Sequence, residues 1–287
     1  MGPRLAAISD DLSSDFGDAA RLAAELGLSG LAVRHVDGRN INELEPCAVT
    51  AVRRTADRYG LDISAVSSPL GRGVSVDADP APALALLDRM IAYADVLGTN
   101  LVRFFACWIP GKDPIEDWWE RPDLTAALPR LLDRVGAFTD RAERAGVILM
   151  LELEGASYAG QVAEARTLMT EVGSPSLALC WDVCNGWWSG EHPVTTGLGL
   201  ALRLPIVDVQ FKDVRARADD PARPELTQVV LGTGDIDYDT IISTLRRNDY
   251  AGWYTVERVY HPRRPEVERS LQDAIIADLR HLRSLLT

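Results

Sequence analysis

Four oxygen-bearing side chains each follow a short apolar run in the second half of the chain. They are Glu152, Asp182, Gln210 and Glu257. Apolar runs of four to eight residues are typical of buried parallel strands, and charges are rarely buried unless they are paired or bind a metal. Carboxylate and amide oxygens suit hard divalent cations. The four residues therefore predict a metal site for Mn²⁺, with Mg²⁺ or Co²⁺ as alternatives.

A structural interpretation of the same residues is also open. Each acidic side chain could end its strand and pair with a cation of the chain instead of a metal. The candidate cations are Arg34, Arg103, Lys212 and Arg258.

The elements that must position these residues alternate between strands and helices along the whole chain. Eight strand-then-helix units in 287 residues, with no linker or change of composition, predict an α/β fold: a single (β/α)8 TIM barrel over residues 1–287. In such barrels the chemistry lies at the carboxyl ends of the strands, where the four residues stand. The expected strands are 4–8, 30–34, 61–66, 100–105, 147–153, 177–182, 206–210 and 253–257. The expected helices include 15–26, 42–59, 80–97, 124–145, 160–172 and 265–286.

Composition excludes several classes of partner. The net charge of -12 argues against nucleic acid, which requires a basic surface. No segment resembles a signal peptide or a membrane span, so we expect a cytoplasmic protein that does not bind membranes. The four cysteines form no CxxC pair, and we interpret them as reduced thiols, mostly in the core.

Short motifs in a fixed order resemble the xylose isomerase-like sugar isomerase and epimerase superfamily of TIM barrels. These motifs are Gly146-Val147 through Glu154, Asp182-x-x-Asn185, Gln210-x-Lys212-Asp213, the strand ending in Glu257, and the turn Gly232-x-Gly234-Asp235-Ile236-Asp237. We expect Asp237 to lie near a helix N-cap.

The resemblance implies one divalent metal bound by Glu, Asp, His and Glu. These ligands correspond to Glu152, Asp182, Gln210 and Glu257. Gln210 departs from the usual histidine, although an amide oxygen can still bind a metal. Some dehydratases of the superfamily are similar in carrying glutamine there, which favours a lyase as an alternative.

The implied reaction is proton abstraction next to a carbonyl through a metal-stabilised enediolate. Glu152 and Glu257 would be the catalytic residues, one removing a proton and the other returning it. The predicted function is a metal-dependent sugar or keto-sugar isomerase or epimerase. The alternatives are a lyase of the same fold, which dehydrates a keto-cyclitol or eliminates an aglycone, and a non-catalytic binding subunit.

Further residues near the expected strand ends could contact a sugar or cyclitol substrate. They are Glu154, Asn185, Lys212, His35, Trp108, Trp187 and Arg258. Histidine could act as a general acid, and His261 is a second candidate for this role. Tryptophan offers an apolar face to a sugar ring, and five of the seven tryptophans are expected in loops on the active face. A homo-oligomer or a small partner subunit is also possible for this family.

Overall fold

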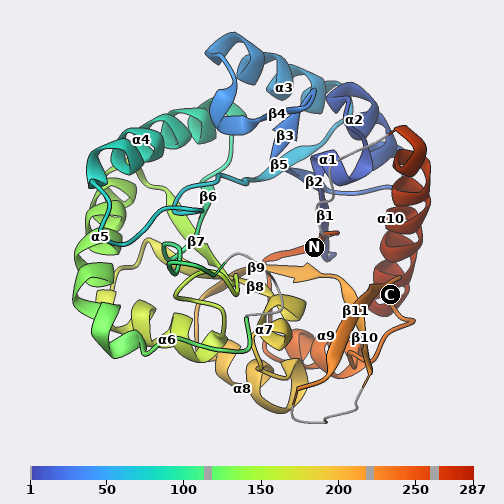
Figure 1. Cartoon of the computed structure of the whole chain (residues 1–287). Helices are drawn as coiled ribbons and strands as arrows, with labels where there is room; N and C mark the ends of the chain where they lie inside the picture. Colours follow the sequence, from blue (N-terminus) through green and yellow to red (C-terminus); the bar gives the residue numbers. More distant parts are fainter. Residues whose placement is uncertain (1, 113–117, 218–222, 259–264) are drawn as a thin grey trace. The chain divides into compact units, whose positions relative to one another are not determined.

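The eight main strands form a closed parallel barrel, and helices alternate with them along the chain (Figure 1). The computed structural model describes residues 2–112, 118–217, 223–258 and 265–287. In their order around the barrel, the strands are β1 (Arg4–Ile8), β12 (Trp253–Val256), β9 (Ile206–Phe211), β8 (Leu177–Asp182), β7 (Ile148–Glu152), β6 (Leu101–Phe104), β5 (Asp62–Val66) and β2 (Gly30–Val33). The predicted (β/α)8 barrel is confirmed.

The long helices agree closely with the periodicity of the sequence. They are α2 (Phe16–Glu25), α3 (Pro46–Arg58), α4 (Pro80–Leu97), α5 (Leu124–Ala145), α6 (Val162–Val172), α9 (Tyr238–Arg247) and α10 (Pro265–Leu286). The single helix expected over 42–59 is wrong. A 3-10 turn, η1 (Ile41–Glu43), comes first, and α3 begins at Pro46, because proline is favoured at the first helical position and cannot continue a preceding turn.

Several short elements were not predicted. They are α1 (Ser9–Leu12), α7 (Val183–Trp188), η3 (Pro193–Gly197), α8 (Leu198–Ala201), and two antiparallel pairs, β3 (His35–Val36) with β4 (Arg39–Asn40) and β10 (Asp213–Arg217) with β11 (Glu225–Val229). Each is too short to give a clear periodic signal.

Local sequence signals set the helix ends. Asp123 accepts a hydrogen bond from the backbone N–H of Thr125 and begins α5. Gly146 ends the same helix in the left-handed conformation, with φ of 67°, and the chain then enters β7. Asp237 accepts from the N–H of Thr240 and caps α9, as the sequence predicted.

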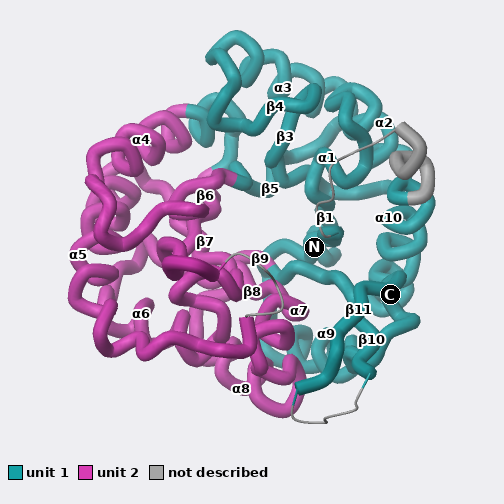
Figure 2. Tube along the Cα trace, in the orientation of Figure 1, with its two compact units in different colours: residues 1–67, 93–99, 209–287 teal, residues 68–92, 100–208 magenta. Residues whose placement is uncertain are grey.

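The chain divides into two compact units (Figure 2). Unit 1 contains Met1–Ser67, Tyr93–Thr99 and Val209–Thr287, and unit 2 contains Ser68–Ala92 and Asn100–Asp208.

Each unit has its own aromatic packing. In unit 2, Phe104 of β6 packs edge-on against Phe138 of α5, with ring centroids 6.3 Å apart. In unit 1, the indole of Trp253 lies against Gly30, where a Cβ would come within 2.9 Å of the ring. A side chain at position 30 would therefore displace Trp253 from the wall of β2.

Among the described residues, the structure contains no helix whose length and hydropathy would suffice to cross a membrane.

Candidate active site

Glu152 is the last residue of β7, and only 3% of its surface is exposed. Its Oε2 accepts a hydrogen bond from Nη1 of Arg103 at 3.0 Å. Arg103 is itself buried and pairs with Met150 in the register of β6 and β7, so both partners lie near the carboxyl ends of their strands. The buried carboxylate is thus held by a buried guanidinium, which offsets part of the cost of removing both charges from water.

Asp182 ends β8 and is fully buried. Its Oδ1 accepts from the backbone N–H groups of Cys184 and Asn185, at 3.0 and 2.9 Å, and so caps α7. The amide of Asn185 donates to the carbonyl of Leu153 at 2.7 Å. The spacing Asp182-x-x-Asn185 therefore orients the aspartate through a helix cap and ties α7 to the segment after β7.

Glu257 follows β12 in unit 1 and is held on both carboxylate oxygens. Nη1 of Arg34 donates to Oε1 at 2.9 Å, and Nζ of Lys212 donates to Oε2 at 3.1 Å. All three side chains are buried, and Gln210 of β9 is buried completely. Lys212 therefore balances the charge of Glu257, one of the two roles that its position in the sequence left open.

Arg34 also binds two aspartates that the sequence analysis missed. Nη2 of Arg34 donates to Asp11 at 2.7 Å and to Asp10 at 3.0 Å. Both aspartates are buried in α1, directly after β1. In the later strands, a carboxylate directly after an apolar run was interpreted as a site residue. The same interpretation of the first strand would have identified these two aspartates.

These two aspartates have opposite pKa shifts. Burial is the largest influence on Asp11 and raises its pKa to about 6, helped by the charges of Asp10 and Glu257 and opposed by Arg34. Burial also acts on Asp10, but the charge of Arg34 and a hydrogen bond with His35 outweigh it and hold the pKa of Asp10 well below its usual range. Negative charge is therefore concentrated around a single guanidinium.

A family model described as xylose isomerase-like TIM barrel matches residues 20–285. The chain belongs to the xylose isomerase-like TIM barrel family. This match confirms the resemblance that the strand-end motifs indicated.

Proteins that are similar to the chain in sequence or in fold include different enzymes. An inosose dehydratase of Bacillus thuringiensis (strain Al Hakam) is 32% identical over 111 residues, which are 35% of this chain and about a third (36%) of that enzyme. The crystal structure of a probable 3-DHS dehydratase from Bacillus anthracis has a TM-score of 0.74 at 20% identity, covering 99% of both chains. A D-allulose 3-epimerase from Methylomonas sp. has a TM-score of 0.71 at 15% identity, covering 99% of this chain and 98% of the other.

Two predicted substrate contacts of this family member already have partners within unit 1. Nδ1 of His35 lies 3.2 Å from Oδ2 of Asp10. Arg258 binds Asp278 of α10 through two nitrogens, at 2.7 and 3.1 Å, and its backbone N–H donates to Asp11. Arg258 therefore pairs with a helix carboxylate and not with Glu257. His261 lies outside the described residues.

Lys212, described above with Glu257, is also in unit 1, and the other predicted contacts lie in unit 2. Glu154 is buried two residues beyond the end of β7. Trp108 is partly exposed and packs edge-on against Phe105, with ring centroids 6.2 Å apart. Trp187 is buried within α7 and packs against His192 at 4.7 Å. Their roles as substrate contacts stay predictions.

One further expectation is wrong. Trp187 and Trp188 were expected in a loop, but they lie in α7, which begins because Asp182 caps it. Three of the four cysteines are buried, in agreement with thiols that lie mostly in the core, and Cys47 is exposed in the first turn of α3. All four are free thiols, as predicted.

Gly155, the residue after Glu154, allows an indole to cover the end of β7. A Cβ at position 155 would lie 2.2 Å from the indole of Trp118, far inside van der Waals contact. We expect Gly155→Ala to displace Trp118 and to lower the free energy of unfolding by about 1–3 kcal/mol, the usual cost of overpacking. Tryptophan fluorescence and urea denaturation would measure both effects.

Gly136→Ala is the matched control for this change. Gly136 lies inside α5, and a Cβ there would meet no atom within 4 Å. Because alanine has a higher helix propensity than glycine, this variant should raise the free energy of unfolding by about 0.5–1 kcal/mol. Equal stabilities of the two variants would contradict the packing of Trp118 on Gly155.

Proposed function

We propose that the chain is a divalent-metal-dependent enzyme that isomerises or epimerises a sugar or keto-sugar by moving a proton next to a carbonyl. The observation that carries this proposal is the set of buried carboxylates at strand ends, Glu152, Asp182 and Glu257. The similar proteins described above are named as epimerases and dehydratases, and these names refer to compounds of this chemical class.

The donor chemistry of these residues fits a divalent cation. In unit 1, the described buried carboxylates near Glu257 outnumber the arginine and lysine side chains that bond them. Arg34 and Lys212 together serve three carboxylates in unit 1: Asp10, Asp11 and Glu257. Buried negative charge of this kind calls for a further cation, and oxygen donors favour Mn²⁺ or Mg²⁺. Glu152, Asp182, Gln210 and Glu257 would be its ligands.

When bound, the cation would polarise the substrate carbonyl and stabilise the negative charge that develops beside it. Glu152 would move the proton at one face of the substrate and Glu257 at the other. Arg103 holds Oε2 of Glu152, and Arg34 and Lys212 hold Glu257, so each carboxylate is oriented before substrate arrives. Lys212 also supplies a positive charge beside Glu257.

A lyase that eliminates water from a keto-cyclitol is the second candidate. Gln210 in place of histidine favours it, and two of the relatives are named as dehydratases. Both reactions begin with removal of a proton next to a carbonyl, and they differ in whether a leaving group follows. Incubation with D-fructose and with an inosose in deuterated water separates them: an epimerase incorporates deuterium into the sugar, whereas a dehydratase yields a product that has lost one water.

Metal binding is the first property to test. We expect purified protein to hold about one Mn, Mg or Co per chain, and a chelator to lower its melting temperature. Added Mn²⁺ at 100 times its dissociation constant would raise the free energy of unfolding of the metal-free protein by about 2.7 kcal/mol. Elemental analysis and thermal melts measure these effects.

Asp182→Asn is the matched control, because asparagine can still cap α7 but lacks the charge. We expect this variant to fold and to respond much less to Mn²⁺. Absence of metal from the wild type, with no response to added Mn²⁺, would contradict both enzyme proposals and favour a binding subunit.

A further inference from the structure

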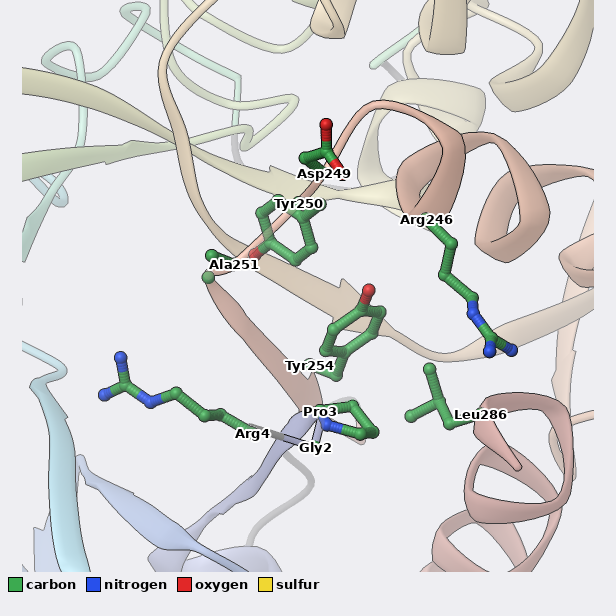
Figure 3. A pocket seen from close by; sticks show the side chains of 10 residues that line it. Gly2, Pro3, Arg4, Arg246, Asp249, Tyr250, Ala251, Tyr254 and Leu286 are labelled. Carbon is green, nitrogen blue, oxygen red and sulfur yellow. The ribbon is translucent and has the colours of Figure 1, made fainter.

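A cavity of about 510 Å³ lies at the amino-terminal ends of β1 and β12, within unit 1 (Figure 3). Pro3 and Arg4 line it from the start of β1, and Tyr254 lines it from β12. Arg246 at the end of α9 and Leu286 at the end of α10 complete much of the wall. The proposed metal ligand Glu257 follows the opposite, carboxyl end of β12. The cavity is therefore separate from the catalytic residues proposed above.

Tyr254 supplies a hydroxyl group to the wall of this cavity. The residue is only 3% exposed, because its ring stacks on Phe211 and packs edge-on against Tyr250. The hydroxyl of Tyr250 donates to the carbonyl of Trp253 at 2.7 Å, whereas no described residue hydrogen-bonds the hydroxyl of Tyr254. Tyr254 lines the cavity, and its hydroxyl is therefore available to a ligand there.

Arg246 supplies a positive charge to the same cavity. No carboxylate of the described residues forms a salt bridge with it, and its charge opposes the rise in the pKa of Tyr254 that burial causes. Arg4 differs, because its guanidinium stacks over the ring of Trp253 at 3.8 Å. Asp249 also lines the cavity (Figure 3). The hydroxyl of Tyr254 and the guanidinium of Arg246 are thus two donors suited to one anionic group.

Apart from Arg4 and Asp249, the rest of the wall is mostly apolar. Pro3, the ring of Tyr250 and the side chain of Leu286 line the cavity beside the two donors (Figure 3). A volume of this size is within the range of sites for small molecules. An inorganic anion would accept hydrogen bonds from the two donors but would leave the apolar wall exposed to water. An aromatic ring that bears a carboxylate would contact both the donors and the apolar wall.

We propose that this cavity is a second ligand site, which binds a small aromatic carboxylic acid. The carboxylate would accept from Arg246 and from the hydroxyl of Tyr254, and the ring would lie against Pro3, Tyr250 and Leu286. None of these residues belongs to the proposed catalytic set, so the site does not depend on the proposed activity.

Titration of the full-length protein with benzoate, followed by calorimetry and by NMR of the ligand, tests this site. We expect saturable binding of benzoate, no binding of the neutral benzyl alcohol, and weaker binding of inorganic phosphate. Tyr254→Phe keeps the packed ring and removes one donor, and we expect about tenfold weaker binding. Arg246→Gln should weaken binding at least as much.

Two control variants make the outcome specific. Arg247→Gln changes the neighbouring arginine, which bonds Thr244 and does not line the cavity, so it should bind benzoate like the wild type. Glu257→Gln tests whether benzoate binds at the catalytic residues instead, and it should also leave binding unchanged. Absence of saturable benzoate binding, or equal affinities of wild type, Tyr254→Phe and Arg246→Gln, would overturn the proposal.

Discussion

Replacing Arg34 by methionine is expected to lower the free energy of unfolding by about 3–5 kcal/mol, the cost of leaving buried charges without their partner. The guanidinium is buried and bonds Asp10, Asp11 and Glu257. Methionine fills a similar volume but cannot neutralise any of the three. Urea denaturation at neutral pH measures the loss.

A double variant separates charge from packing in this prediction. Asp11 has the raised pKa of the pair, so Asp11→Asn removes the carboxylate that is least stable in its ionised form. We expect Arg34→Met with Asp11→Asn to be less destabilised than Arg34→Met alone. Arg21→Met is the surface control, because Arg21 makes exposed ion pairs with Asp18 and Glu25, and it should change stability little. An equal loss in the single and double variants would contradict the electrostatic origin.

Replacing Glu152 by glutamine is expected to reduce turnover by about 10³-fold or more. A positioned general acid or base contributes about 10² to 10⁴ in rate, and Glu152 is also a proposed metal ligand. Glutamine can still accept a hydrogen bond from Arg103, so the strand end should keep its position. Deuterium incorporation into the substrate measures the chemical step, and denaturation checks that the variant is folded.

Glu171→Gln is the control within the same unit, because Glu171 is an exposed residue of α6. It should leave turnover unchanged. Glu257→Gln should also abolish turnover, although it leaves Arg34 and Lys212 without a carboxylate partner and should lower stability as well. Activity that survives both Glu152→Gln and Glu257→Gln would refute the proposed mechanism.

The regular part of the fold could be predicted because its signals are local. Helices α4, α5 and α10 have the bounds expected from their periodicity, and the strands that end near Glu152 and Asp182 are the apolar runs of the sequence. Short elements could not be predicted, because four to six residues contain less than two periods of a helix. The helix α7 depends on Asp182, which the sequence analysis had interpreted as a metal ligand or a strand end paired with a cation, and not as a helix cap.

The sequence by itself determined the alternation of strands and helices, hence the barrel, and the residues that stand at the strand ends. These features depend on the periodicity of apolar residues, and a few neighbouring residues are enough to specify a strand or a helix cap. Only the tertiary structure decided the partners of the charges: Arg103 with Glu152, Arg34 and Lys212 with Glu257, and Arg258 with Asp278. Asp10 and Glu257 lie far apart in the sequence, and they share one guanidinium because folding brings β1, β2 and β12 together. Pairing of buried charges depends on which strands become neighbours, and no local pattern contains that information.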